Sequence, residues 1–280
     1  MMKKNVLEIS EVDLGKNSHI RLDVLDTNED LYYDMARVMF DEIKLNNSLG
    51  KKTAFICPVG PVGQYSKLAR MVNIYKLDLK DVYIFNMDEY LTDELEYIPE
   101  QSPLSFRGFM NKEFYSKIDD GLTVPVDQRI FPQPGKESKI CECIQEIGGI
   151  DMAFGGVGIN GHIAFNEPPE NDEYTCDEYK KLGTRILKLS SETRTMNAVT
   201  AANGAIDLIP KWCITLGMKE IMSARKVRIY LERIWQNGVV RKMLHGPITK
   251  AFPASLLQEH PDVVIVMASY VAKLPICKLK

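Results

Sequence analysis

A glycine-rich segment that carries several proton-transferring groups occupies residues 155–168, which read GGVGINGHIAFNEP. It contains four glycines, one of the four histidines of the chain, His162, and the carboxylate Glu167. Glycines at this density lose chain entropy and side-chain packing, so they indicate a backbone that bends sharply or lies close to a ligand. A carboxylate that accepts from one ring nitrogen of a histidine fixes the tautomer and raises the basicity of the ring. The segment therefore predicts a proton shuttle, with a structural histidine as the alternative.

Two adjacent carboxylates, Asp88 and Glu89, follow an apolar run in the stretch VYIFNMDEY, residues 82–90. Acids that follow a strand commonly cap the next helix or turn, which is one interpretation of Asp88. The other interpretation is a general base at the ligand-binding edge of a sheet. The residues alone leave both open.

Apolar runs that alternate with helical patterns have to position these groups. Residues 27–44 have the spacing of an amphipathic helix, with Thr27 or Asn28 as the N-cap. Its apolar face is formed by Leu31, Met35, Val38, Met39 and Ile43. Further helical patterns cover 66–76, 105–118 and 139–147, and the expected strands lie in 53–60, 82–90, 150–158, 226–231 and 262–269.

Several of these strands are apolar at consecutive positions, which is typical of a parallel sheet covered on both faces. The sequence therefore predicts one α/β domain, Rossmann-like and doubly wound, with a mostly parallel sheet. Ligands of such sheets bind beyond the carboxyl ends of the strands, where the strand order reverses. Three of the expected strands run into PVGPVG, NMDEY and GGVGINGH, so we expect these three segments to converge on one site.

Composition excludes several classes of function. The 280 residues carry a net charge of −3 without a basic block, so neither a nucleic acid nor a membrane is expected as a partner. The N-terminus has no apolar signal region, and we expect a cytoplasmic protein. The six cysteines form no CxxC pair and no cluster with histidine, so we expect free thiols and no metal.

The motif FNMDEY, residues 85–90, followed by the glycine-rich segment resembles the paired motifs of the glucosamine-6-phosphate deaminases, also called isomerases. GPITKAFPASLLQEHPDVVIV, residues 246–266, is similar to a later segment of that family, and the resemblance runs in order from about residue 20 to about residue 270. Related phosphogluconolactonases share the fold, but their glycine motif does not continue into IAFNEP. The resemblance implies no metal or organic cofactor, and an enzyme of the hydrolase class that converts a 2-amino-2-deoxy aldose to a ketose and ammonia.

The resemblance also implies roles for individual residues. Asp88 would move the C2 proton to C1, His162 would handle the proton of the ring oxygen, and Glu167 would orient His162. Asn160 stands where some members of the family have aspartate, so it can hold geometry without sharing charge. The expected substrate-binding residues are Gly60, Val62, Gly63, Glu89, Gly156, Gly158, Gly161 and Arg194.

The end of the site that would hold the C6 phosphate departs from the family pattern. Members usually carry a T-G-x-T-P loop, whereas here both threonines are replaced, by Val59 and Val62, and Pro61 has no N–H to donate. The arginine of the family aligns near Val199, and its lysine is missing after the strand 226–231. Basic residues that could compensate are Arg194, Arg233 and Lys242. We therefore expect the deaminase chemistry to be retained while phosphate specificity is relaxed or changed, so that the partner is a small sugar or sugar phosphate.

Other interpretations stay open at the level of sequence. An ordinary glucosamine-6-phosphate deaminase, a non-catalytic sugar-binding or sensing paralogue, and a phosphogluconolactonase-like hydrolase are the alternatives. Residues 185–208 are expected to form a lid over the site, or else a connection that does not move. The first twenty residues are expected to be an extra strand or a loose end, and a homo-oligomer is possible.

Overall fold

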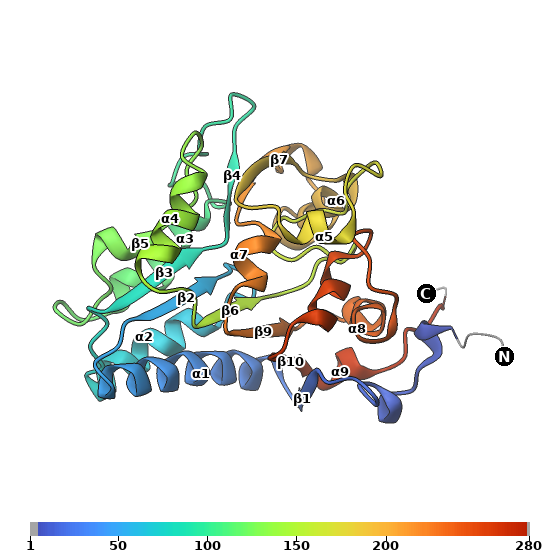
Figure 1. Cartoon of the computed structure of the whole chain (residues 1–280), viewed down its shortest axis with the longest axis horizontal. Helices are drawn as coiled ribbons and strands as arrows, with labels where there is room; N and C mark the ends of the chain where they lie inside the picture. The colour runs from blue at the N-terminus through green and yellow to red at the C-terminus, as the bar shows by residue number, and fades with distance from the viewer. Residues whose placement is uncertain (1–4, 279–280) are drawn as a thin grey trace.

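The main sheet of the protein is seen in a computed structural model, which describes residues 5–278. It has seven strands in the order β1-β10-β9-β6-β2-β3-β5, and all neighbouring pairs are parallel (Figure 1). The strands are β1 (Arg21–Leu25), β2 (Thr53–Cys57), β3 (Val82–Asn86), β5 (Arg129–Ile130), β6 (Met152–Gly155), β9 (Lys226–Leu231) and β10 (Val263–Ala268).

The strand order reverses between β2 and β6. After β2 the chain adds β3 and β5 on one side, and then returns to add β6, β9 and β10 on the other. This confirms the expected doubly wound, Rossmann-like α/β fold with a parallel sheet. The reversal opens a crevice beyond the carboxyl ends of β2 and β6, where ligands of such sheets bind.

Helices cover both faces of this sheet because its strands are apolar on both sides. In β2, Phe55 and Cys57 belong to one buried cluster, whereas Ala54 and Ile56 belong to another. The first cluster packs on α1 (Asn28–Ser48), α2 (Gln64–Tyr75) and α3 (Phe106–Glu113); α1 runs along one side of the sheet in Figure 1. The second packs on α4 (Ser138–Glu146), α7 (Met218–Met222), α8 (Gln236–His245), α9 (Ser269–Ala272) and the 3₁₀ helix Pro253–Glu259.

A second, smaller sheet stands beside the carboxyl edge of the first. It is antiparallel and consists of β4 (Asp88–Leu91), β8 (Trp212–Thr215) and β7 (Arg185–Lys188), in that order. The remaining helices, α5 (Cys176–Lys180) and α6 (Ser191–Ala201), flank β7 in the chain. Short 3₁₀ helices span Tyr115–Lys117, Val126–Gln128 and Ile206–Leu208.

Most of the predicted elements are confirmed, and two expectations are corrected. The helix predicted at 27–44 is α1, capped by Thr27, whose side chain accepts from the backbone N–H of Asp30. The run 82–90 is not one strand that stops at acids: β3 ends at Asn86, and Asp88 begins β4 in the other sheet. Where the structure describes them, the first twenty residues are neither a strand nor a loose end. They contain the 3₁₀ helices Val6–Glu8 and Glu11–Asp13. Arg241 of α8 holds them by donating to the carbonyl of Ile9 at 2.8 Å.

No helix within residues 5–278 combines the length and the apolar content that a membrane crossing would require.

Candidate active site

A cavity of about 470 Å³ lies at the carboxyl edge of the main sheet. Its walls come from the segments that follow β2, β3, β6 and β9, together with residues of α6 and of the start of α3. The volume falls within the range of roughly 300–1,000 Å³ that is usual for small-molecule sites. The three glycine- or acid-bearing segments predicted to converge do meet here, at the reversal of strand order between β2 and β6.

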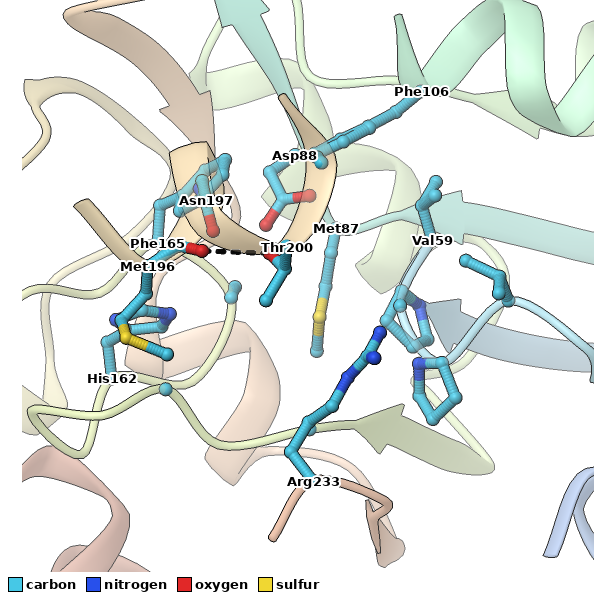
Figure 2. Close-up of a pocket in the computed structure, with 18 of the residues that line it drawn as sticks. Val59, Met87, Asp88, Phe106, His162, Phe165, Met196, Asn197, Thr200 and Arg233 are labelled. Atoms are coloured by element: carbon cyan, nitrogen blue, oxygen red, sulfur yellow. Dashed lines mark hydrogen bonds between the residues drawn. The ribbon is translucent and has the colours of Figure 1, made fainter. Parts of the chain in front are cut away.

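Asp88 borders this cavity as the first residue of β4, where it pairs with Thr215 of β8. Its side chain is buried, yet its carboxylate points into the cavity (Figure 2). In the described part of the chain no hydrogen bond reaches that carboxylate. Burial, and then the negative charge of Glu89, raises the pKa of Asp88 well above its usual range. A carboxylate with a raised pKa and free lone pairs is suited to accept a proton from a ligand.

Glu89 is not among the residues that line the cavity, so its role as a substrate-binding residue stays a prediction that the lining does not support. Its side chain is fully buried and accepts from the backbone N–H groups of Phe106 (3.1 Å) and Arg107 (2.9 Å) and from Ser105 Oγ (3.0 Å). It also lies 3.3 Å from Nε of Arg107. Negative charge is favoured at a helix N-terminus, so Glu89, not Asp88, is the acid that caps a helix, α3.

The ring of His162 borders the cavity with a defined tautomer. Its Nδ1 lies 2.8 Å from Oδ1 of Asn160, an atom that can only accept, and 3.1 Å from Oγ1 of Thr193. The amide of Asn160 cannot be reversed, because its Nδ2 donates to Glu167 Oε2 at 2.6 Å and to Ser190 Oγ at 3.2 Å. Nδ1 of His162 therefore carries a proton, and Nε2 is the nitrogen left to exchange one with a ligand.

Glu167 lies behind His162, outside the cavity lining, and reaches the ring chiefly through Asn160. Its Oε2 is 3.7 Å from Nδ1 of His162 and accepts from Ser190 Oγ at 3.1 Å. Burial raises the pKa of Glu167, but the facing His162 ring and the donors of Thr193 and Asn160 outweigh this and lower the pKa to about 2. The geometry is a chain in the order His162, Asn160, Glu167 rather than two acids flanking a histidine.

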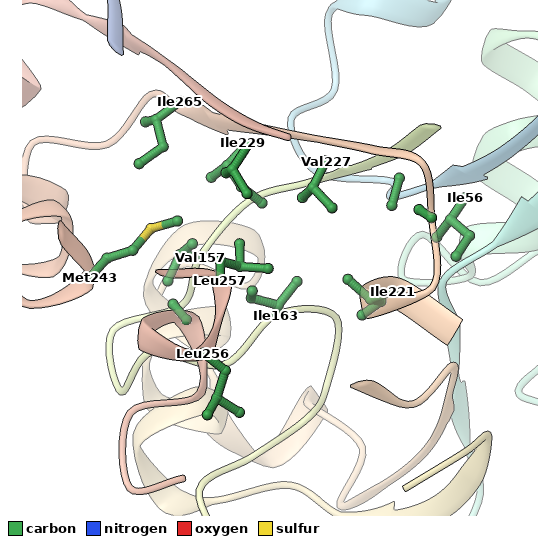
Figure 3. Close-up of a cluster of buried hydrophobic side chains, with 14 of the residues drawn as sticks. Ile56, Val157, Ile163, Ile221, Val227, Ile229, Met243, Leu256, Leu257 and Ile265 are labelled. Atoms are coloured by element: carbon green, nitrogen blue, oxygen red, sulfur yellow. The ribbon is translucent and has the colours of Figure 1, made fainter. Parts of the chain in front are cut away.

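The glycine-rich segment is shaped around the imidazole. A Cβ on Gly158 would lie 2.0 Å from Cε1 of His162, so only glycine leaves room for the ring. Gly161 turns the chain at φ +86° and packs against Phe252, where a Cβ would lie 2.5 Å from the ring. Val157 and Ile163 are buried in the core on either side of this turn (Figure 3). The burial of these two apolar side chains anchors the segment to the core, while His162 remains at the cavity.

The other predicted substrate-binding residues divide into two groups. Those that line the cavity are Gly60, Val62, Gly156 and Gly158. Those placed outside its lining, besides Glu89, are Gly63, Gly161 and Arg194. Gly63 precedes α2 and faces the ring of Tyr32, and Arg194 donates to the carbonyl of Ile209 at 3.2 Å. The two glycines thus make room for aromatic rings, and Arg194 holds the backbone that follows α6.

The far side of the cavity, which we call the distal end, consists of Val59, Pro61, Val62, Glu232 and Arg233. Of the three basic residues proposed to compensate for missing phosphate ligands, Arg233 borders the cavity, whereas Arg194 and Lys242 do not. In Figure 2 the Arg233 side chain enters from the side opposite Asp88. Glu232 was not among the predicted site residues, although it follows β9 just as other site residues follow their strands.

The start of α6 lies within the predicted lid, but its contacts with the catalytic residues were not predicted. Ser190 is its N-cap and donates to Glu167, and Thr193 in its first turn contacts His162. Further along α6, Met196, Asn197 and Thr200 line the cavity (Figure 2). A serine before a helical run predicts a cap, but its contact with Glu167 depends on tertiary packing. Among the residues that the structure describes, no group of three or more His, Cys, Asp or Glu side chains could hold a metal ion.

The chain is similar over most of its length to known proteins. The chain is 33% identical to the glucosamine-6-phosphate deaminase of Clostridium perfringens (strain SM101 / Type A) over 263 residues, which is 91% of this chain and 99% of the relative. It is 29% identical to the enzyme of the same name from Mycoplasma mycoides, over 89% of this chain and 94% of the relative. No family model matches the chain.

Among solved structures, a monomeric glucosamine-6-phosphate deaminase described as a missing link of the NagB superfamily superimposes with a TM-score of 0.78. It is 26% identical and covers 91% of this chain and 100% of its own. The 6-phosphogluconolactonase of Trypanosoma brucei superimposes with a TM-score of 0.63 at 17% identity, over 91% of this chain and 98% of its own, a likeness of fold alone.

Proposed function

The chain belongs to the glucosamine-6-phosphate deaminase family, and from this premise we propose that its cavity isomerises and deaminates a 2-amino-2-deoxy aldose, giving a ketose and ammonia. The observation that carries the proposal is the placement of Asp88 and His162 on one cavity, with Asn160 and Glu167 behind the ring. The carboxylate and the imidazole come from different sheets and loops, so their convergence is a property of the fold.

The ring of the sugar is opened first in this scheme. Nε2 of His162, which has a free lone pair, takes the proton of the anomeric hydroxyl and delivers it to the ring oxygen. Glu167 stays ionised because its pKa is about 2, and it holds the amide of Asn160 that fixes the tautomer of His162. The open chain then presents an aldehyde, next to which the C2 proton is acidic enough to remove.

Asp88 then acts as the base. It takes the proton from C2 and returns it to C1, while a proton of the amine passes to O1, so the amine-bearing carbon becomes an imine and C1 becomes an alcohol. Water adds to the imine and ammonia leaves, and this consumption of water places the net reaction among hydrolyses. The raised pKa of Asp88 supports the role, because a stronger base shares more of the proton in the transition state.

Recognition of the sugar at the distal end is proposed to differ from that of a phosphate site. Val59 and Val62 bring no hydroxyl to the loop after β2, and Pro61 has no N–H. A loop that holds a dianion normally supplies several such donors.

The proposal is tested by measuring ammonia and ketose formation from glucosamine and from glucosamine 6-phosphate. We expect Asp88→Asn to lower kcat by about 10²–10⁴-fold, the usual contribution of general-base catalysis. Asp93→Asn is the matched control, because Asp93 is exposed and pairs with Lys211 outside the cavity. Full activity of Asp88→Asn would contradict the proposal. A wild type that binds aminosugars without turnover would instead indicate a binding paralogue, and hydrolysis of a sugar lactone would indicate a lactonase.

A further inference from the structure

Glu232 brings a second carboxylate to the cavity, next to Arg233. It directly follows β9, is 8% exposed and borders the cavity. Its Oε2 accepts from the hydroxyl of Tyr32, and its Oε1 lies 3.1 Å from Nη2 of Arg233. Burial and the hydrogen bond to Glu232 raise the pKa of Tyr32, so Tyr32 remains a neutral donor. A carboxylate has roughly four lone-pair sites, so about two are left for a ligand.

The charges around the cavity do not favour a dianion. Besides the phenols of Tyr90 and Tyr230, the ionisable side chains on its lining are Asp88, His162, Glu232 and Arg233. Two carboxyl groups, those of Asp88 and Glu232, share the lining with one guanidinium, and that guanidinium already pairs with Glu232. A phosphate ester at the distal end would lie beside a buried carboxylate of the same sign, an arrangement that costs affinity.

We propose that Glu232 determines specificity at the distal end, and that the substrate is a 2-amino-2-deoxy aldose whose far end is a free hydroxyl rather than a phosphate ester. The hydroxyl donates to the Glu232 carboxylate and accepts from Arg233, so both charged side chains keep a partner. This inference rests on the proposed function, since it concerns the same cavity and the same sugar.

Binding of two unreactive analogues separates specificity from turnover. 2-Amino-2-deoxyglucitol and its 6-phosphate both lack the carbonyl on which the chemistry depends, so calorimetry can measure their affinities whether or not the enzyme turns over. We expect wild type to bind the unphosphorylated analogue at least about tenfold more tightly, because like charges face each other in the phosphorylated complex.

Two variants test the part that Glu232 plays. Glu232→Gln keeps the shape but removes the charge, and should shift the affinity ratio by about tenfold towards the phosphorylated analogue. Arg233→Met leaves the Glu232 charge unpaired and should weaken the phosphorylated analogue further; Arg233 is half-exposed, so its loss leaves the fold intact. Glu42→Gln is the control of matched charge, since Glu42 pairs with Lys226 away from the cavity, and its ratio should equal that of wild type.

The outcomes are distinct. Tighter binding of the 6-phosphate by wild type, or an unchanged ratio in Glu232→Gln, would overturn the inference. The same ratio shift in Glu42→Gln would do so as well, because it would trace the effect to overall charge. Ammonia release from glucosamine 6-phosphate with a high kcat/KM, and none from glucosamine, would overturn the inference and leave the proposed function standing. Absence of ammonia release from either sugar, beside the expected affinity ratio, would reject the proposed function alone.

Discussion

At the scale of single residues, two positions carry costs that only a function explains. Asp88 holds a carboxylate in a buried position without a hydrogen bond from the described chain, and Gly158 gives up a side chain to make room for the imidazole of His162. Buried ionisable groups and other locally unfavourable arrangements of this kind are concentrated at functional sites of proteins.

Asp88→Asn should be inactive and yet more stable than wild type near neutral pH. A carboxyl with a folded-state pKa above its unfolded value binds its proton more tightly when folded. Its destabilisation is therefore absent below the unfolded pKa, about 3.9, and complete above the raised folded pKa. We expect Tm at pH 7 to rise by about 2–4 °C for each kcal/mol relieved, with the difference vanishing at low pH. Calorimetry across pH measures this, and a lower Tm for the variant at pH 7 would contradict it.

The decrease of kcat/KM at low pH should reflect the titration of Asp88. Asp88 must be ionised to accept the C2 proton, so kcat/KM should fall as the pH drops through a pKa well above that of an ordinary aspartate. A profile that stays flat down to about pH 4 would show that no such group limits the free enzyme.

Gly158→Ala should abolish turnover while the protein still folds. A Cβ 2.0 Å from Cε1 of His162 has to displace the ring and break the Nδ1 contact with Asn160. We expect kcat to fall by about 10²-fold or more, because small misplacements of catalytic groups cost this much. Gly238→Ala in α8 is the control: its Cβ would make an ordinary 3.6 Å contact, and activity should be unchanged.

At the scale of elements, Glu89 holds strand β4 in place through the N-terminus of helix α3. It sits in β4 beside Asp88 and accepts from the first turn of α3, so strand and helix are tied together next to the cavity. Asp88 thereby receives both its position and part of its raised pKa.

Glu89→Gln should destabilise the fold strongly. It removes the buried charge that pairs with Arg107 and leaves donors of α3 poorly matched, which typically costs about 3–5 kcal/mol. Glu113→Gln, at the other end of α3, breaks only the surface pairs with Lys117 and Lys112 and should cost less than about 1 kcal/mol. Urea denaturation measures both; equal stabilities, with a raised KM in Glu89→Gln, would restore Glu89 as a substrate ligand.

At the scale of the whole molecule, α6 links the site to the rest of the smaller sheet. The predicted lid, residues 185–208, contains β7, which pairs with β8, and α6, whose first turn contacts His162. Closure over the ligand stays a prediction, and the pairing of β7 suggests that any motion begins after Lys188.

Hydrogen exchange tests that motion. We expect binding of 2-amino-2-deoxyglucitol to slow hydrogen exchange in α6 and in the 3₁₀ helix Ile206–Leu208. Exchange in α1 should be unchanged, because α1 packs on one face of the main sheet, outside the cavity lining. Equal protection of α6 with and without the ligand would indicate a fixed connection.

The sequence by itself determined the helices α1 to α4, five of the seven strands of the main sheet and the loops that meet at its edge. Apolar periodicity and caps such as Thr27 are local signals, so they are legible without the fold. Only the tertiary structure decided that Asp88 opens a strand of a second sheet, that Asn160 stands between His162 and Glu167, and that Glu232 reaches the cavity. These depend on strand register and side-chain direction between segments far apart in the chain, which no local pattern encodes.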